Sequence, residues 1–515
     1  MFDRGALLGL LKNLDLGASV AEVDDILYQA RVETGTFWNL FKDSVDLIPG
    51  TKGSGKSALF KLFVKYLPET LLKQKKVVLA HGIDIEGDQV FHVFTDRFDR
   101  LTASEFQNFW YVYFVSLISE VLLKQERFRG FFTDAQSEIS DFQVQCAAAK
   151  IPDIKAPQTL KGVIEWCINA ATRNLKPRKV SVPIGAGEKQ LELEFGEQPT
   201  VIEPLNEKPL PLYVDGIRSA LNALLAKADI TIWLMLDKLD EIFPRWSDVE
   251  RKGLSSLLRA MYSFRGDRVR VKIFLRDDIF EHLTSGEEGF PGLTHITARM
   301  ASSLSWRIED ILQLIVKRVF VAHLGLVCGI DSERLNANHA YREEAFYKAF
   351  PRQVHKGERQ SSTIDWIYTH CQDGRKVVAP RDVVDLLIFT RDAEIQLLQS
   401  NTEGTSDCIF SSAAIERGFK MMSKHKRDVF LQAEFPHFRD DILRFENGPA
   451  IYSRDALGQL FGNRVDEVVD KLAKIGFLTE QSSKQGPIFT IPFLYRPAFE
   501  VRQTKAKYGQ AEADD

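Results

Sequence analysis

Apolar residues recur along the chain at the spacing of amphipathic helices, interrupted by short continuous apolar runs of the kind that form buried strands. The first 35 residues have apolar positions at helical spacing, and we expect them to be helical and to pack beside the nucleotide-binding core. Short apolar stretches fall at 45–48, 76–80, 230–236 and 269–275, and the one at 230–236 is continuous. Such runs, separated by helical patterns, are typical of parallel strands. We therefore predict an α/β fold with a parallel sheet.

A stripe of aromatic and aliphatic residues is expected to be core rather than a surface that stacks on nucleic-acid bases. Its members are Phe106, Phe109, Trp110, Tyr113, Phe114, Leu117, Ile118 and Val121. Their spacing is helical, and no basic residues are interleaved with them, whereas base-stacking surfaces combine aromatic residues with cations that follow the phosphate backbone. The stripe therefore predicts a buried helix.

A glycine-rich turn after the first apolar run indicates the chemistry of the site. Its eight residues fit the pattern G-x-x-x-x-G-K-[ST] and are Gly50, Thr51, Lys52, Gly53, Ser54, Gly55, Lys56 and Ser57. Glycines at this spacing let successive backbone N–H groups turn toward phosphates, with Lys56 on the β and γ oxygens and Ser57 on Mg²⁺. A helix expected at about 56–67 would point its positive end at the anion. The sequence therefore predicts a nucleotide-binding site.

The apolar run at 230–236 ends abruptly in acidic residues. Asp237, Asp240 and Glu241 follow it, and ligands of open α/β sheets bind at the carboxyl ends of the strands. Asp237 is therefore predicted to complete the Mg²⁺ site opposite Ser57. Asp240 or Glu241 is predicted to orient an attacking water molecule.

The run at 269–275 is followed by Arg276 and two aspartates, which again places charge at the end of a strand. Arg276 is a candidate γ-phosphate sensor; alternatively, it is a salt-bridge residue paired with Asp277 or Asp278. Three nearby arginines are candidates for a finger that serves a neighbouring subunit: Arg265, Arg268 and Arg299. The sequence does not choose among them.

Length, charge and cysteine content limit the kinds of protein that this chain can be. With 515 residues the chain is long enough for about three domains. Its formal net charge of −4 generates no field that would gather nucleic acid, so any DNA contact must be local. The five cysteines lack metal-binding spacing, and no signal peptide or membrane-spanning run is present in this sequence. We expect a cytoplasmic protein without a membrane partner.

These motifs resemble those of P-loop ATPases of the AAA+/STAND type, including KAP-like and origin-recognition-like bacterial ATPases, over about residues 37–389. In STAND proteins an apolar run is followed by Asp, a small residue, an apolar residue and Asp-Glu. Residues 237–241 match this pattern except at Lys238, which also replaces the glutamate that ordinary AAA+ ATPases place after the aspartate. Which carboxylate is the general base therefore stays open.

The resemblance also implies further roles and boundaries. Arg276 would be the strand-four arginine, Leu304-Ser305-Trp306 would open a helical lid, and Arg381 would be a second nucleotide sensor, unless Arg381 only caps or pairs on its helix. The domains then are a helical lead-in at 1–36, an ATPase core at 37–303 with an insertion at about 149–212, a lid at 304–425, a winged-helix domain at 426–503 and a flexible tail at 504–515. The insertion contains a short alternating run that suggests a hairpin or an arm.

The C-terminal pattern consists of helices followed by strands at 477–478 and 488–491, joined by a wing at 482–486, and resembles a winged helix. The expected recognition helix, at about 463–475, balances three basic residues against three acidic ones, which favours contact with protein over DNA. Fold alone does not decide function.

Three functions are compatible with these features. The first is an ATP-hydrolysing, homo-oligomeric switch or scaffold that acts with a separate effector protein, by family analogy in bacterial antiphage defence. The second is a DNA-binding ATPase that loads or remodels partners through its winged helix. The third is a scaffold that binds ATP without hydrolysing it, suggested by Lys238. All three use ATP and Mg²⁺; a small-molecule kinase with the insertion as its substrate domain fits less well.

Overall fold

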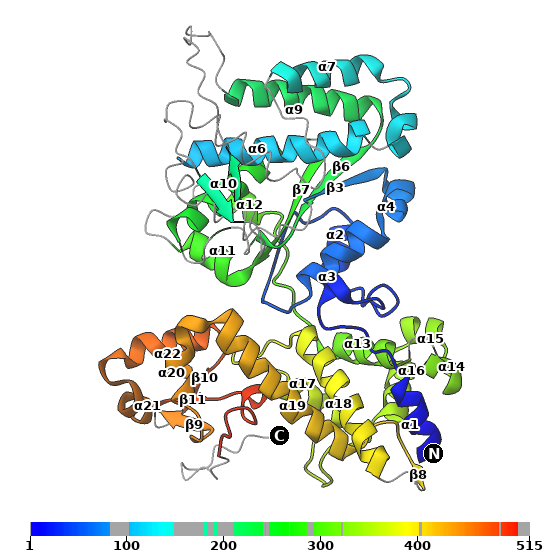
Figure 1. The fold of residues 1–515 in the computed structure, drawn as a ribbon, viewed down its shortest axis with the longest axis vertical. Helices are drawn as coiled ribbons and strands as arrows, with labels where there is room; N and C mark the ends of the chain where they lie inside the picture. The colour runs from blue at the N-terminus through cyan, green and yellow to red at the C-terminus, as the bar shows by residue number, and fades with distance from the viewer. Residues whose placement is uncertain are drawn as a thin grey trace. The chain divides into compact units, whose positions relative to one another are not determined.

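The computed structural model forms two compact units. The residues it describes are 2–82, 102–124, 126–148, 180–183, 190–193, 210–239, 243, 247–266, 268–285, 293–320, 323–400, 404–483 and 486–502. The first unit comprises Met1–Phe37, Thr51–Ala58 and Leu304–Asp515, and the second comprises Trp38–Gly50 and Leu59–Ser303. The second unit contains the large sheet, and the first consists mainly of helices (Figure 1).

The second unit is built on a four-stranded parallel sheet in the order β2-β7-β6-β3. Its strands are β2 (Leu47–Gly50), β3 (Val77–His81), β6 (Thr231–Leu236) and β7 (Val269–Arg276). The four predicted strands are therefore confirmed, with ends shifted by one or two residues. Because β7 lies between β2 and β6, the strand that ends in Arg276 separates the strand before the glycine-rich loop from the strand before Asp237.

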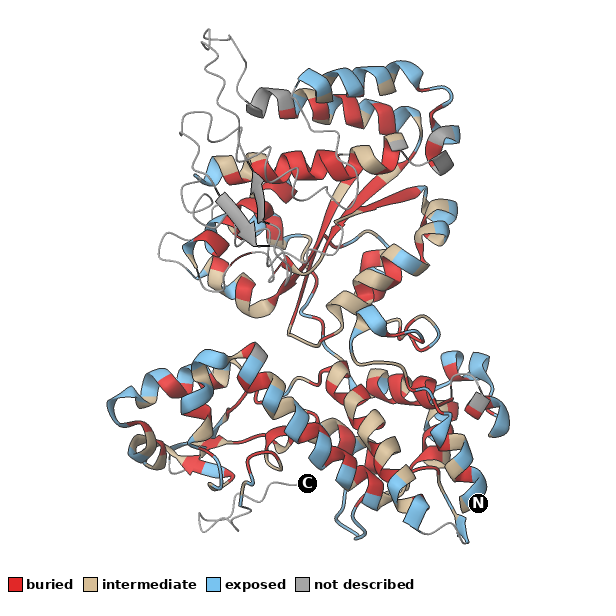
Figure 2. Ribbon diagram, in the orientation of Figure 1, coloured by how far each residue is buried: buried red, intermediate tan, exposed pale blue. Residues whose placement is uncertain are grey.

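Both faces of the sheet are covered, because alternate side chains of a strand point to opposite faces. Ile232 and Leu234 of β6 belong to the apolar core that includes α6 (Ala103–Ser119). Trp233, between them, stacks on Phe63 with ring centroids 6.4 Å apart. The buried residues accordingly follow the strands and the inner sides of the flanking helices (Figure 2).

The described helices between residues 35 and 297 pack around this sheet or on the helices that cover it. They are α2 (Gly35–Phe41), α3 (Lys56–Lys61), α4 (Pro68–Lys75), α6, α7 (Gln136–Ala148), α9 (Leu210–Lys227), α10 (Asp248–Phe264), α11 (Asp277–Thr284) and α12 (Leu293–Thr297). All eight members of the predicted stripe are buried, on α6 and the turn after it. Trp110 also donates a hydrogen bond to the Gly253 carbonyl oxygen of α10 at 2.8 Å. The core interpretation is confirmed.

Within the predicted insertion the structure describes one antiparallel pair, β4 (Val180–Pro183) with β5 (Gln190–Leu193). This pairing is consistent with the hairpin that the alternating run suggested. All other residues from 149 to 209 lie outside the described residues, as does the tail.

The first unit has one shared apolar core for its N-terminal, central and C-terminal parts. Its helices are α1 (Arg4–Lys12), α13 (Ile308–Phe320), α14 (His323–Val327), α15 (Ser332–Ala337), α16 (His339–Ala349), α17 (Thr363–His370), α18 (Pro380–Ser400), α19 (Ser412–Val429), α20 (Arg439–Leu443), α21 (Arg454–Phe461) and α22 (Val465–Lys474). The long helices α18 and α19 pack closely at Gly418, where a Cβ would lie 2.6 Å from the backbone nitrogen of Thr390. The predicted lid and C-terminal domain therefore do not have separate cores.

The N-terminal segment is less helical than we expected. Only α1 and a 3₁₀ turn at Ala21–Val23 are helical, because Asp24 accepts a hydrogen bond from the Ala18 backbone and pairs with Arg318, which stabilises a loop instead. Helix α1 packs on α18 and belongs to the first unit, which also contains Thr51–Ala58 with most of the glycine-rich loop. In the same unit β1 (Phe2–Asp3) pairs with β8 (Thr405–Ser406). That the segment packs beside the nucleotide-binding core stays a prediction.

The C-terminal part of the chain has a three-stranded antiparallel sheet in the order β10-β11-β9. The strands are β9 (Ile451–Ser453), β10 (Thr479–Ser483) and β11 (Gly486–Thr490), and α21 and α22 lie between β9 and β10 in the sequence. The predicted strand at 477–478 begins two residues later, because Phe477 and Leu478 are buried core residues before it. β9 was not predicted, since three residues make too short a pattern.

Candidate nucleotide-binding site

The glycine-rich loop has the local structure that its sequence predicts. β2 ends at Gly50, and α3 begins at Lys56 and continues into a π-helical turn at Leu62–Tyr66. Gly53 and Gly55 have φ values of 78° and 98°, in the left-handed region that glycine adopts without steric cost. The expected order of strand, loop and helix is confirmed.

Lys56 lies within the loop. Its Nζ donates a hydrogen bond to the Thr51 carbonyl oxygen at 2.8 Å, and the Ser54 N–H donates to the same oxygen at 3.2 Å. The ammonium group is therefore held among the peptide groups of the loop, where an entering phosphate can exchange with the carbonyl oxygen. Ser57, the second residue of α3, follows it directly.

Two buried polar atoms beside the loop lack a hydrogen-bond partner among the described residues. They are the Ser54 hydroxyl oxygen and Nε of Arg381. Arg381 packs on the loop, since its Cβ lies 3.4 Å from the position that a Cβ on Gly53 would occupy. A buried donor on an arginine is costly to leave unmatched, and a phosphate oxygen is a suitable acceptor. The residues around the loop therefore fit an anionic ligand.

A chain of charged groups links the loop to the end of α19. Lys52 Nζ lies 3.6 Å from Oε1 of the buried Glu434, and Lys426 Nζ lies 3.1 Å from Oδ1 of Asp382, the residue after Arg381. Burial raises the pKa of the Asp382 carboxyl, and Lys426 offsets part of that effect. Sequence analysis missed Glu434 and Lys426, because nothing in the local pattern marks Glu434 as a partner of the distant Lys52 or Lys426 as a partner of Asp382.

The carboxyl edge of the sheet brings other predicted residues to one side of the second unit. Gly50 is the register partner of Arg276, and Asp237 directly follows β6, which is parallel to β7. Lys238 has a φ of 57°, which is uncommon for a residue other than glycine. Glycine, which has no Cβ, would adopt that conformation at lower cost. Asp240 and Glu241 lie outside the described residues.

Arg276 is buried and engaged in a two-point ion pair. Its Nε and Nη2 donate to Oδ1 and Oδ2 of Asp278 at 2.9 and 2.6 Å. The alternative interpretation of Arg276, pairing with a neighbouring aspartate, therefore describes the observed contact, although in a buried rather than a surface setting. A role as γ-phosphate sensor remains a prediction. It would require Arg276 to leave Asp278 or to bind Asp278 and the phosphate together.

Neither family models nor curated proteins match the chain. Among solved structures, the Walker-type ATPase paby2304 of Pyrococcus abyssi is similar at 12% identity and a TM-score of 0.37, with 94% of this chain and 98% of that chain covered. The ORC2 protein of Aeropyrum pernix, in ADPNP–ADP complexes, is similar at 10% identity and a TM-score of 0.36, with 91% and 93% covered.

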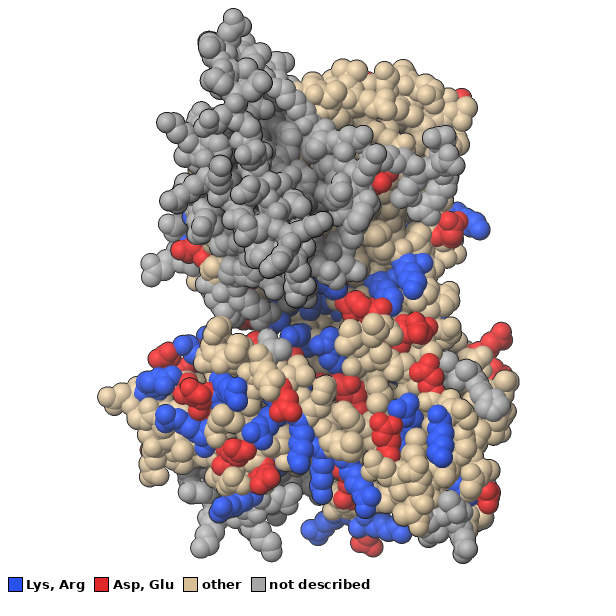
Figure 3. Space-filling model, in the orientation of Figure 1, with Lys and Arg blue, Asp and Glu red and all other residues tan. Residues whose placement is uncertain are grey.

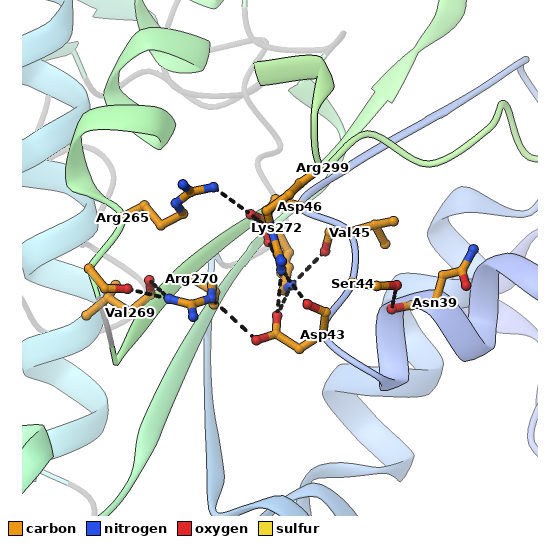
Figure 4. A network of polar contacts seen from close by, with 11 residues as sticks. Asn39, Asp43, Ser44, Val45, Asp46, Arg265, Val269, Arg270, Lys272 and Arg299 are labelled. Atoms are coloured by element: carbon orange, nitrogen blue, oxygen red, sulfur yellow. Dashed lines mark hydrogen bonds and ion pairs between the residues drawn. The ribbon is translucent and has the colours of Figure 1, made fainter. Parts of the chain in front are cut away.

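The three candidate finger arginines are all paired within the chain. Arg265 and Arg299 contact Asp46 at 3.9 and 2.6 Å, and Arg268 contacts Asp229 at 3.1 Å. The first two belong to a network at the start of β2, which also includes Asp43, Arg270 and Lys272 (Figure 4). A finger role for any of them would require it to leave a carboxylate of its own chain.

The same network holds Asp46 in its charged form. Burial alone would raise the pKa of the Asp46 carboxyl, but the hydrogen bond from Arg299 and the charge of Lys272 outweigh burial and lower it. Burial alone would lower the pKa of the Arg299 guanidinium. The hydrogen bond to Asp46 and the charge of Asp46 outweigh burial, so that this pKa is raised. The network is therefore a fixed part of the second unit at physiological pH.

The described part of the chain has neither a cluster of metal-binding side chains nor a membrane-spanning helix. No group of three or more His, Cys, Asp or Glu side chains there is placed to hold a metal ion. A Mg²⁺ ion bound through one hydroxyl, one carboxylate and phosphate oxygens does not need such a group. None of the described helices is both long and apolar enough to cross a membrane.

Proposed function

We propose that this chain binds ATP together with Mg²⁺ and hydrolyses it to ADP and phosphate. The observation that carries the proposal is the loop itself: left-handed glycines, Lys56 held among the loop carbonyls, and Arg381 beside them with a buried, unmatched Nε. This combination of a preformed backbone cradle and two cations suits a polyphosphate. ATP is preferred to GTP because no N-K-x-D motif follows the acidic strand.

Each residue would have a defined task. Lys56 and Arg381 bind the phosphate oxygens, while Ser57 and Asp237 are the ligands of the metal. Mg²⁺ held by these residues would neutralise negative charge on the phosphates. Asp240 or Glu241 orients the attacking water molecule. Arg276 contacts the γ-phosphate if it leaves its ion pair with Asp278.

Steady-state phosphate release by the full chain tests this function. We expect the wild-type protein to bind MgATP and release phosphate, and Asp240→Asn to bind with similar affinity but turn over about 100-fold more slowly if Asp240 is the base. The matched variant Glu241→Gln then separates the two candidates. Failure to bind ATP would refute the proposal; binding without release under any condition would leave a nucleotide-locked scaffold.

We further propose that the protein is a cytoplasmic homo-oligomeric switch that acts with a separate effector, by family analogy in bacterial antiphage defence, and that its C-terminal part is a winged-helix domain that contacts protein. The order of helices and strands around β9, β10 and β11 supports the domain type. The basic residues on and beside α22 are paired with acids: Lys471 with Glu467, Lys474 with Asp470 and Arg464 with Asp441. Figure 3 likewise shows acidic and basic side chains interspersed on the visible face.

Retention on duplex DNA distinguishes this assignment from the alternative, a DNA-binding ATPase. Because the α22 cations are already paired, we expect no measurable retention of the full chain even at low salt. Binding that weakens steeply with added salt, and that is lost in the Lys471→Glu/Lys474→Glu double variant, would favour the DNA-binding function instead.

A further inference from the structure

Trp306 contacts the glycine-rich loop directly. It precedes α13, and its indole Nε1 donates a hydrogen bond to the Ser54 carbonyl oxygen at 2.8 Å. Its ring also covers the next residue: the Cζ2 and Nε1 atoms lie 3.5 and 3.8 Å from the position that a Cβ on Gly55 would occupy. The indole therefore contacts one peptide group of the loop by hydrogen bond and by packing.

The hydrogen bond orients the peptide between Ser54 and Gly55. In a planar trans peptide the C=O and N–H groups point in opposite directions. With the Ser54 carbonyl directed at the indole, the Gly55 N–H is directed away from Trp306. The peptide precedes Gly55, whose φ of 98° lies where glycine has the greatest freedom, so without a partner this peptide can rotate easily.

Trp306 is itself held in place. Its backbone carbonyl oxygen accepts a hydrogen bond from the Tyr368 hydroxyl of α17 at 3.0 Å. Cγ of Pro380 also lies 3.7 Å from the position that the same Cβ would occupy. The loop glycine thus lies close to two rigid rings, and the donor that fixes its peptide has little freedom of its own.

Packing alone does not account for these contacts. Trp306 is only partly buried and packs at the margin of the shared core of the first unit. An apolar contact would explain the position of the ring. It would not explain why the single polar atom of the side chain is directed at a carbonyl inside the phosphate loop.

We propose that Trp306 is a positioning residue for phosphate binding, which fixes the Ser54–Gly55 peptide so that the Gly55 N–H faces the phosphates of the nucleotide. The proposal rests on the proposed function, because it assigns a task within the same site. Without the indole N–H, the Ser54–Gly55 peptide could rotate. The Ser54 carbonyl oxygen would then face the phosphates and repel them, and the Gly55 N–H would no longer donate to them.

The test compares Trp306→Phe, which keeps an aromatic ring but removes the N–H, with Trp38→Phe as control. Trp38 is the exposed tryptophan of α2, 42% accessible, and its ring contacts Phe41 edge-on. We expect titration calorimetry with MgADP to show a five- to tenfold weaker Kd for Trp306→Phe, about the value of one hydrogen bond, and no change for Trp38→Phe. Tyr368→Phe should weaken binding about two- to threefold.

A spectroscopic signal separates positioning from general stability. We expect MgADP to change the tryptophan emission of the wild type and of Trp38→Phe, and this response to disappear in Trp306→Phe while its thermal unfolding without nucleotide stays near that of the wild type. Equal affinity and an undiminished emission response in Trp306→Phe would overturn the positioning role while the proposed function stands. If the wild type binds no nucleotide, the proposed function fails, and the positioning role fails with it.

Discussion

The variant Lys56→Ala is expected to bind ATP with an affinity about 100-fold or more below that of the wild type, and to release no measurable phosphate. The Lys56 ammonium already lies in the loop on the Thr51 carbonyl oxygen, so it can transfer to phosphate oxygens without a large rearrangement. Hydrogen bonds to charged groups contribute about 1.5 to 3 kcal/mol each, and a lysine on the β and γ oxygens makes more than one. A fluorescent ATP analogue and a phosphate-release assay measure both losses.

Lys73→Ala is the matched control, because Lys73 is an exposed lysine of α4 outside the loop. We expect it to bind and hydrolyse ATP as the wild type does. Thermal unfolding without nucleotide should be similar for both variants, since Lys56 donates to a carbonyl of its own loop. Retention of wild-type affinity by Lys56→Ala would mean that the loop is not the phosphate site.

The largest effect on stability is expected from Lys272→Met in the second unit. Lys272 has no exposed surface, and its Nζ donates to the Val45 carbonyl oxygen at 2.6 Å, to Asp46 at 2.8 Å and to Asp43. It also lies over the ring of Trp233, 4.8 Å from the centroid. Methionine fills a similar volume but leaves two carboxylates short of a cation, which costs about 3 kcal/mol or more.

For a unit of this size, such a loss lowers the unfolding midpoint by roughly 6 to 12 °C, which differential scanning calorimetry resolves. Lys76→Met provides the comparison, because Lys76 forms an exposed ion pair with Asp229 at the start of β3. Removal of an exposed pair costs about 1 kcal/mol or less. If both variants melt alike, the buried network does not stabilise the unit.

Local sequence patterns were sufficient for the loop and the sheet. The loop from Gly50 to Ser57 is defined by glycines whose required conformation is local, and β6 is a continuous apolar run with acidic residues after it. The helix of the aromatic stripe was predictable for the same reason, since its burial follows from helical spacing. In each case the information lies within a few neighbouring residues.

Partners distant in sequence were not predictable. Lys272 interrupts an apolar strand, and nothing near it indicates that Asp43 and Asp46, more than 220 residues earlier, supply its counter-charges. Lys52 and Glu434 pair across an even longer separation. The loop at residues 13–34 depends on Asp24 and Arg318 in the same way, so helical spacing alone predicted the wrong local structure there. Tertiary contacts determined these positions.

The contact of α1 with α18 has a consequence for the newly made chain. α1 ends at Lys12, but the helix that covers its apolar side begins only at Pro380. At about 5 to 20 residues per second, the ribosome takes roughly 20 to 75 s to synthesise the residues between them. Leu7 and Leu11, both buried in the finished protein, lack this partner throughout that time. Helix α1 therefore gains this packing partner only after residues 13–379 have been made.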